Sequence, residues 1–535
     1  MSLKPLNFKG FIQKTLKNHV LFILFTIIYF AFAFLTYKDF GVTYDERVEY
    51  DNGKFLLSYL QNPTPVFYVD ELVNSRPVHI EARQLPLYSV YSRVYPALLN
   101  ILNPNYYFEW FHLQNMCMGF FLFLFSYILF YLNYRSGIKA IVAPLFLSLT
   151  SLLLGHIPAN PKDIPFATSY LLGVLAIHIF QKYKASKYLK ILVLGTVFGL
   201  AQSQRTVALT LFVLQVFLEV FSKENLDLKT FLDCVLENIL IFIVSLLVWI
   251  ICLPFLGASF FANFKEILHN AAGYPEWDHE IIYFGKFLYK DQRPWHYLYV
   301  YMLIKLPVVT LFSFIGGTLA CIFKKIKYKL NHPVTFLMFL VVVNSILYLV
   351  LHPVIYNGIR HFLYLVTCVT LISAFFFVDI LAVVEKKYKV SILAVVFFYG
   401  VFTVGRMFHL HPYEYIYYNE LIGGLKGAEG KFDMEYWGAG YKKGAEYVRE
   451  LIEDMNLKDI KVYPCDNQFA VVYYSRFEYE IVNRSRDAEL MICDTHKDTL
   501  RGYYDKTHPI IVPVKREGVT IFNIRARKDF IEENL

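Results

Sequence analysis

The chain has 535 residues, of which 56% are hydrophobic and only 18% are charged, and its formal net charge is +8. This composition excludes a soluble enzyme of this size, because many apolar runs reach the roughly 20 residues that a helix needs to cross a bilayer. The positive charge does not indicate binding of nucleic acid, since the basic residues stand in short segments between apolar runs, where they set membrane topology.

The first apolar run covers residues 19–37, and the tail before it carries four lysines and no acidic residue. By the positive-inside rule, this tail is predicted to be cytoplasmic and the first helix to run outward. The run lacks the small-residue cleavage site of a signal peptide, so we expect a retained helix. A long outer loop is expected at 38–114, and the apolar spacing within 51–60 predicts a short helix at the membrane surface.

The later runs bring the prediction to about eleven transmembrane helices. The expected segments are 116–133, 140–155, 164–180, two short helices within 189–221, 234–255, 298–323, 334–351, 362–384 and 391–408. A single helix over 189–221 would overspan the bilayer at 1.5 Å per residue. The polar sequence QSQR breaks this stretch, so we place Arg205 at an outer turn between two helices. A second outer loop is expected at 258–297.

The composition changes near residue 409, which divides the chain into a membrane domain, 1–408, and a small α/β domain, 409–535, predicted to lie outside the membrane. In this second part, KGAEYVRELIEDM has the spacing of an amphipathic helix. The segments KDIKVYP, FAVVYYS, AELMICD, HPIIVPV and VTIFNIR are predicted to be short strands. Cys465 and Cys493 lie in this part and could pair if it is extracytoplasmic, but spacing alone does not establish pairing.

Conspicuous polar side chains gather at the outer ends of the expected helices. They are Asp45, Glu46, Lys162, Asp163, Arg205, Arg360, His361, Tyr413 and Glu414. Ordinary solvation at the interface accounts for any one of them, because charge costs less there than at the bilayer centre. The inner side, however, carries almost only lysine, whereas the outer side mixes acids, arginine and histidine with aromatic residues. This mixture suits a site for an anionic lipid and a hydroxyl acceptor.

The chemistry of sugar transfer from a polyprenyl phosphate assigns roles to these residues. The phosphate that leaves is an anion, which arginine or lysine must offset. The acceptor hydroxyl is a poor nucleophile and needs a carboxylate base. Asp45 is our candidate for that base. The candidate phosphate ligands are Arg205, Arg360, His361 and Lys162, and the candidate substrate-binding residues are Asp163, Tyr413 and Glu414.

Other motifs give weaker signals. His409 and His411 stand two residues apart without a third ligand, so an interfacial pair is a better interpretation than a metal site. The sequence contains no Walker A pattern, no nucleophile elbow and no cysteine-rich ligand set. We therefore predict no cofactor and no metal, while a requirement for a divalent cation stays open.

Several motifs together resemble the C-type (GT-C) membrane glycosyltransferases. They are TYDE after the first helix, NPKDIPFA, the turn at Arg205, RPWHYLYVYMLIKLP and GIRHFLYL. The resemblance is strongest to the family 39 group, which includes protein O-mannosyltransferases and aminoarabinose transferases, and HPYEYIYYNELIGG followed by FDMEYWG is similar to a bacterial and archaeal branch. The resemblance covers about residues 15–440. It implies an inverting transfer from a polyprenyl-phosphate sugar to a protein, lipid or glycan acceptor on the outer face, with Asp45 as the catalytic carboxylate and Glu46 as the second acid of the family's pair.

Two alternatives remain open. One is a transporter or flippase for a lipid-linked saccharide, although such proteins often show inverted repeats and interrupted helices, of which the sequence gives no clear sign. The other is a membrane-anchored binding protein whose C-terminal domain carries the function.

Overall fold

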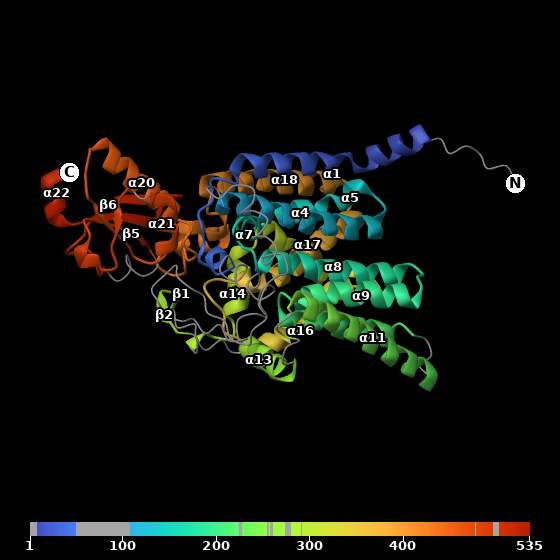
Figure 1. Ribbon diagram of the computed structural model, residues 1–535. Helices are drawn as coiled ribbons and strands as arrows, with labels where there is room; N and C mark the ends of the chain where they lie inside the picture. The colour runs from blue at the N-terminus through green and yellow to red at the C-terminus, as the bar shows by residue number, and fades with distance from the viewer. Residues whose placement is uncertain are drawn as a thin grey trace.

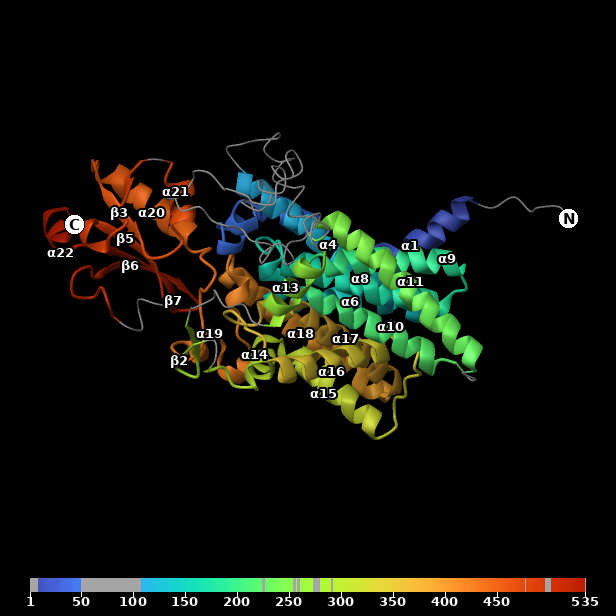
Figure 2. The same ribbon diagram turned by 60° about the horizontal axis from the view of Figure 1, so that its bottom comes forward.

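The computed structural model describes residues 8–49, 107–223, 227–253, 256, 260–272, 280–289, 292–476, 478–495 and 502–534. The helices lie side by side in a bundle (Figure 1, Figure 2). The start of α1 is at one end of this bundle and the C-terminal sheet is at the other. The surface helix predicted at 51–60, and most of the first outer loop, lie outside the described residues.

Seven helices in the described part of the chain are long and apolar enough to cross a membrane. They are α1 (Phe8–Thr36), α4 (Tyr107–Tyr134), α8 (Asp163–Lys182), α11 (Leu228–Cys252), α16 (Pro333–Leu351), α17 (Leu363–Val383) and α18 (Lys386–Leu410). A bent pair, α14 (Tyr297–Lys305) and α15 (Val308–Ile322), makes eight if it counts as one span. The protein is therefore a multi-pass membrane protein.

The remaining three expected passes correspond to shorter helices. They are α5 to α7 (Gly137–Ala140, Val142–Leu149, Ser151–His156), α9 (Lys187–Gln202), and α10 (Leu209–Phe221) after the 3₁₀ turn η3 (Thr206–Ala208). The predicted break at Arg205 is confirmed, because α9 ends at Gln202 and Arg205 has extended backbone angles before η3.

The eighth expected helix, 298–323, is not continuous. The helix direction bends by 114° between its two halves, α14 and α15. The reason is Pro307, which has no N–H to donate and disfavours a helical conformation in the residue before it. Leu306 is extended there. Asn419 donates its side-chain amide to two carbonyls left open at the break, those of Leu303 (2.7 Å) and Leu306 (2.8 Å).

The centre of the bundle is formed by α8 and α17. In the most apolar window of each helix, 78% and 72% of the residues are buried within the protein, compared with 11% for α1 and for α18. These two central helices begin at Asp163 and Leu363. The polar residues just before them therefore lie at one end of the buried centre of the bundle.

The C-terminal part contains a five-stranded sheet in the order β4-β3-β5-β7-β6. The strands are β3 (Lys461–Pro464), β4 (Glu480–Ile481), β5 (Leu490–Asp494), β6 (Ile510–Arg516) and β7 (Val519–Ala526). β3 runs parallel to β4 and β5, while β7 is antiparallel to both β5 and β6. The amphipathic helix α20 (Tyr441–Asp454) packs on this sheet, where Gly444 lies against Ile492 and Phe522. The predicted α/β character is confirmed.

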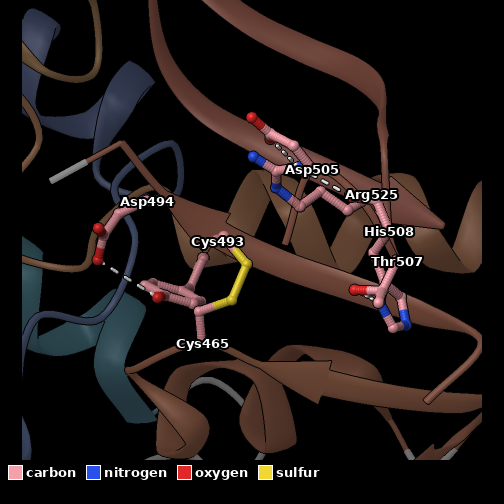
Figure 3. Close-up of a disulfide and its surroundings, with 8 residues drawn as sticks. Cys465, Cys493, Asp494, Asp505, Thr507, His508 and Arg525 are labelled. Atoms are coloured by element: carbon pink, nitrogen blue, oxygen red, sulfur yellow. Dashed lines mark hydrogen bonds and ion pairs between the residues drawn. A yellow bond between two sulfur atoms is a disulfide. The ribbon is translucent and has the colours of Figure 1, made fainter. Parts of the chain in front are cut away.

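Two details of this region were open or wrong in the sequence analysis. The segment FAVVYYS is not a strand but the helix α21 (Gln468–Ser475), whose N-cap is Asn467, with its side chain accepting the N–H of Ala470 at 3.2 Å. Cys465, directly after β3, and Cys493, on the neighbouring strand β5, form a disulfide (Figure 3). The same view includes Arg525 of β7, which pairs with Asp505 at 2.9 Å.

A linking segment, residues 411–440, joins α18 to α20 and so to the sheet region. It contains η6 (Glu414–Ile416), η7 (Glu420–Ile422) and α19 (Gly424–Ala428). Arg406 of α18 forms ion pairs with Glu420 of this segment (2.8 Å) and with Glu517 in the β6–β7 turn (2.6 Å). These pairs fix the sheet to the end of the helix bundle. The loop expected at 258–297 contributes α13 (Phe260–Ala272) and the hairpin of β1 (Ile281–Tyr283) and β2 (Lys286–Leu288).

Candidate active site at the ends of the membrane helices

The carboxylate of Asp45 is the centre of a charged cluster. Asp45 lies in a helical stretch, 44–49, that follows α1, and only 7% of the residue is exposed. Its Oδ2 pairs with Nη1 of Arg360 and accepts the indole N–H of Trp437 at 3.0 Å. Its Oδ1 is 3.8 Å from Nζ of Lys162. Three segments that are distant in sequence thus converge on one acid.

The NPKD turn places Lys162 beside this acid. The side-chain oxygen of Asn160 accepts the backbone N–H groups of Lys162 (3.1 Å) and Asp163 (2.8 Å), which fixes the turn that opens α8. Thr43 donates its hydroxyl to the carbonyl of Ala159 at 3.1 Å, so the turn is also joined to the segment of Asp45.

Lys162 has a second anionic partner, because its Nζ lies 3.2 Å from Oε1 of Glu49. Asp45 and Glu49 are four residues apart in the helical stretch 44–49 and therefore lie on the same face of it. That face carries both acids toward the lysine.

Two further cations, Arg205 and Arg293, lie near His361. The charges of Arg205, Arg360, Lys162 and Arg293 all act on its imidazole ring. Arg205 pairs with Asp163, and its Nε is buried without a hydrogen-bond partner in the described residues. Lys162, Arg205, Arg360 and His361, which we selected from the sequence as phosphate ligands, are thus brought together. Arg293, just before α14, was missed, although it opens the RPWHYLYV motif.

Glu46 has surroundings that differ from those of Asp45. It is fully buried, and its Oε2 accepts the backbone N–H of Thr43 at 2.8 Å. Its Oε1 lies 2.9 Å from Nε2 of His112 on α4, and Nδ1 of that ring donates to the carbonyl of Tyr37 at 3.1 Å. Burial raises the pKa of the Glu46 carboxyl, against the opposing influence of His112 and Thr43. These contacts fasten the Asp45 segment to α4.

A loop from the linking segment, residues 433–439, completes the cluster. The carboxylate of Glu435 is fully buried and accepts the hydroxyl of Tyr415 and the backbone N–H groups of Trp437 (3.1 Å) and Gly438 (3.0 Å). Burial raises the pKa of Glu435 to about 7, although the hydrogen bonds from Tyr415 and Trp437 oppose the rise. Glu435 and Trp437 belong to the FDMEYWG segment, which the sequence marks only as family-like, and neither is among the predicted site residues.

Comparison with known proteins gives a likeness in fold but none in sequence. No protein-family model matches the chain, and no curated protein matches it. The crystal structure of ArnT from Cupriavidus metallidurans in the apo state is similar with a TM-score of 0.51 at 11% identity, covering 95% of this chain and 97% of that one. The structure of the same protein bound to undecaprenyl phosphate has a TM-score of 0.52 at 10% identity, covering 95% and 98%.

ArnT is an aminoarabinose transferase with a GT-C fold. This chain has the GT-C fold. The archaeal oligosaccharyltransferase AglB from Archaeoglobus fulgidus has a TM-score of only 0.45 at 10% identity, covering 87% of this chain and 66% of that one, and this likeness supports no inference.

Two residues selected from the sequence, Tyr413 and Glu414, have contacts elsewhere in the GT-C chain. Glu414 accepts from Nδ1 of His411 at 2.6 Å, and the ring of Tyr413 lies 5.0 Å from the guanidinium of Arg516. His411 also contacts Asp39 at 3.0 Å. These contacts join α18, the sheet and the end of α1, and none of them reaches Asp45. Binding of substrate by Tyr413 and Glu414 stays a prediction.

No group of three or more histidine, cysteine, aspartate or glutamate side chains in the described part of this GT-C chain is arranged to hold a metal ion. The prediction that the protein uses no cofactor stays a prediction. The chemical capacity of the cluster is instead that of the Asp45 carboxylate beside several cations, a combination that can accept a proton and stabilise an anion in one place.

Proposed function

We propose that this protein is an inverting glycosyltransferase that moves a sugar from a polyprenyl-phosphate donor to an acceptor hydroxyl. The observation that carries the proposal is the position of Asp45, a carboxylate held beside Arg360 and Lys162 at the ends of the central membrane helices. The GT-C fold supports it, because a structure with this fold binds undecaprenyl phosphate. The sugar, hexose or pentose, and the acceptor, protein, lipid or glycan, follow from neither observation.

The proposed reaction is a single displacement. The acceptor oxygen attacks the anomeric carbon of the donor sugar, and its proton passes to the Asp45 carboxylate. The bond between the anomeric carbon and the phosphate oxygen breaks, and the electron pair leaves with the polyprenyl phosphate. The phosphate thereby changes from a diester with one negative charge to a monoester with two. Arg205, Arg360 and Lys162 offset the added charge, and attack opposite to the leaving group inverts the anomeric centre.

The ion pair between Arg360 and Asp45 has a consequence for donor binding. A phosphate that enters the cluster competes with the carboxylate for the same guanidinium, since arginine pairs with both groups through its planar fork. Donor binding therefore exchanges one ion pair of Arg360 for another. Oδ2 of Asp45 then keeps its bond from Trp437, and the carboxylate, freed from Arg360, becomes a better base.

We further propose that the cluster faces the outside of the cell, with a cytoplasmic N-terminus and an extracytoplasmic C-terminal sheet. The start of α1 and the sheet lie at opposite ends of the bundle (Figure 1). The loop that joins α8 to α9 contains Lys184 and lies at the same end of the bundle as the start of α1, as the positive-inside rule requires. The disulfide of the sheet supports an oxidising compartment for that region.

The experiment is turnover in lipid nanodiscs with undecaprenyl-phosphate sugars and a panel of hydroxyl acceptors, followed by the release of undecaprenyl phosphate. For Asp45→Asn we expect the rate to fall by about 10²- to 10⁴-fold, the usual contribution of a general base. Asp39→Asn is the matched control, because Asp39 follows the same helix but contacts His411 instead of the cluster. Near wild-type transfer by Asp45→Asn would refute the proposal. Movement of a lipid-linked saccharide across liposomes without turnover would support the transporter instead.

A further inference from the structure

The indole of Trp437 is a neutral partner of the Asp45 carboxylate, beside the two charged partners Arg360 and Lys162. Its Nε1 donates to Oδ2 of Asp45 at 3.0 Å, although 392 residues separate the two in sequence. We propose that Trp437 is a positioning residue, which holds the Asp45 carboxylate so that Oδ1 faces the acceptor hydroxyl. This inference rests on the function proposed above.

The indole is itself fixed on several sides. Its residue is 1% exposed, and its ring packs against His156, with the ring centroids 4.5 Å apart, and edge-on against Tyr415 at 5.6 Å. The buried carboxylate of Glu435 accepts its backbone N–H. An aromatic side chain held in this way directs its N–H at one point, so the hydrogen bond restricts the rotation of the Asp45 carboxylate.

The two segments that carry Trp437 and Asp45 are also joined through their backbones. The N–H of Tyr44 donates to the carbonyl of Trp437 at 3.3 Å. The side-chain amide of Asn467 donates to the carbonyls of Val42 (2.9 Å) and Gly438 (3.3 Å), and so bridges the segments. The loop of the linking segment is therefore built into the site, and its position depends on the sheet region that supplies Asn467.

The approach of the segments requires glycine at one point on each side. A Cβ added to Gly41 would lie 2.1 Å from the backbone oxygen of Ala439. Gly438 has φ of +79°, and a Cβ there would lie 3.0 Å from the ring of Tyr44. Both positions exclude a larger residue, so the chain is fitted closely where Trp437 reaches Asp45.

The neutrality of the indole explains why it suits this role. When a donor phosphate draws Arg360 away from Asp45, the carboxylate loses a charged partner that had also fixed its orientation. An indole N–H carries no net charge, so the phosphate competes with Asp45 for it far less strongly than for a guanidinium. Trp437 therefore keeps Oδ2 occupied during the reaction and leaves Oδ1 to take the proton.

The test is Trp437→Phe, which keeps an aromatic ring but removes the N–H, with Trp295→Phe as control because Trp295 is 62% exposed. We expect kcat/KM to fall by about 10- to 100-fold in Trp437→Phe, the usual effect of losing a hydrogen bond to a charged group. The donor KM should change less than about threefold. The acid limb of the pH–rate profile should move to higher pH by about one unit, because the lost bond had favoured the ionised carboxylate. A wild-type profile and rate would overturn the inference.

A thermal double-mutant cycle separates this role from a general loss of folding. Wild type, Asp45→Asn, Trp437→Phe and the double variant are compared by melting temperature in nanodiscs, which needs no turnover. Non-additive shifts are expected if the two side chains act together, and additive shifts would contradict the inference. If Asp45→Asn is inactive but Trp437→Phe is unaffected, only this inference fails. If Asp45→Asn retains transfer, the proposed function fails first.

Discussion

Replacement of Arg360 by glutamine should slow the chemical step more than it weakens donor binding. The guanidinium pairs with Asp45 when no donor is present, and both side chains are only 10% exposed. Since donor binding exchanges one ion pair for another, the donor KM should rise by less than about threefold. In the proposed reaction, extra negative charge develops on the leaving phosphate only as the bond to the sugar breaks, and we expect Arg360 to stabilise this charge.

The size of the effect follows from Coulomb's law. Two unit charges about 4 Å apart interact by about 4 kcal/mol at an effective dielectric constant of about 20. If roughly half of the new charge has developed in the transition state, the loss is about 2 kcal/mol, or about a 30-fold lower kcat. Arg360→Lys should recover part of the rate, because a lysine supplies the charge without the planar fork of arginine.

The assay is steady-state release of undecaprenyl phosphate over a range of donor concentrations, which separates kcat from KM. Arg406→Gln is a matched control, because Arg406 is also almost buried, with 11% of its side chain exposed, but pairs with Glu420 and Glu517. We expect this control to lower the melting temperature and to leave both kinetic constants within about twofold. An unchanged kcat in Arg360→Gln would refute the reasoning, and so would an equal loss in Arg406→Gln.

Two further predictions concern stability. Burial lowers the pKa of His411, but hydrogen bonds and charges from Glu414 and Asp39 outweigh burial and raise it above 6.5. Folding therefore favours protonated His411, so the stability that this proton contributes is complete below pH 6.5 and is lost as pH rises through the raised pKa. The melting temperature should accordingly fall between pH 6 and 9. In His411→Gln, this pH dependence of the melting temperature should be absent. The second prediction concerns the disulfide between Cys465 and Cys493, which are 28 residues apart in sequence. Replacing both cysteines by serine should lower the free energy of unfolding of the sheet by roughly 3 kcal/mol, measured by denaturant unfolding without reductant. An unchanged free energy of unfolding would contradict a native disulfide.

The predictable part of the fold comprises the elements with long apolar runs. The break at Arg205 was predictable because one helix over 189–221 would be too long for the bilayer. The bend at Pro307 was overlooked although the proline was visible, since the apolar run on both sides satisfied the same length rule. FAVVYYS is a helix and not the predicted strand, because a short run of six apolar residues fits a buried strand or a helix equally well. Its N-cap, Asn467, was the signal that favoured the helix.

In the site, the cations were predictable from the sequence, whereas Trp437 was not. The predicted topology puts three helix ends on one side of the membrane, and these ends carry Lys162, Arg205 and Arg360. The charge pattern was therefore enough to select them. Trp437 reaches Asp45 only through the packing of the linking segment against the residues after α1. No local pattern in the sequence encodes that contact, and so the residue was not selected.

The ranking of the acids follows from the geometry of the helical stretch 44–49. Neighbouring residues on a helix point in directions about 100° apart, so Asp45 and Glu46 cannot both face one cation. Glu46 accordingly contacts His112, whereas Asp45 and Glu49, one turn apart, both face Lys162. Had the segment after α1 been predicted as a helix, the second acid of the cluster would have been sought at Glu49. In the proposed reaction, the adjacent acidic pair thus supplies one group that takes the proton and one that anchors its segment to α4.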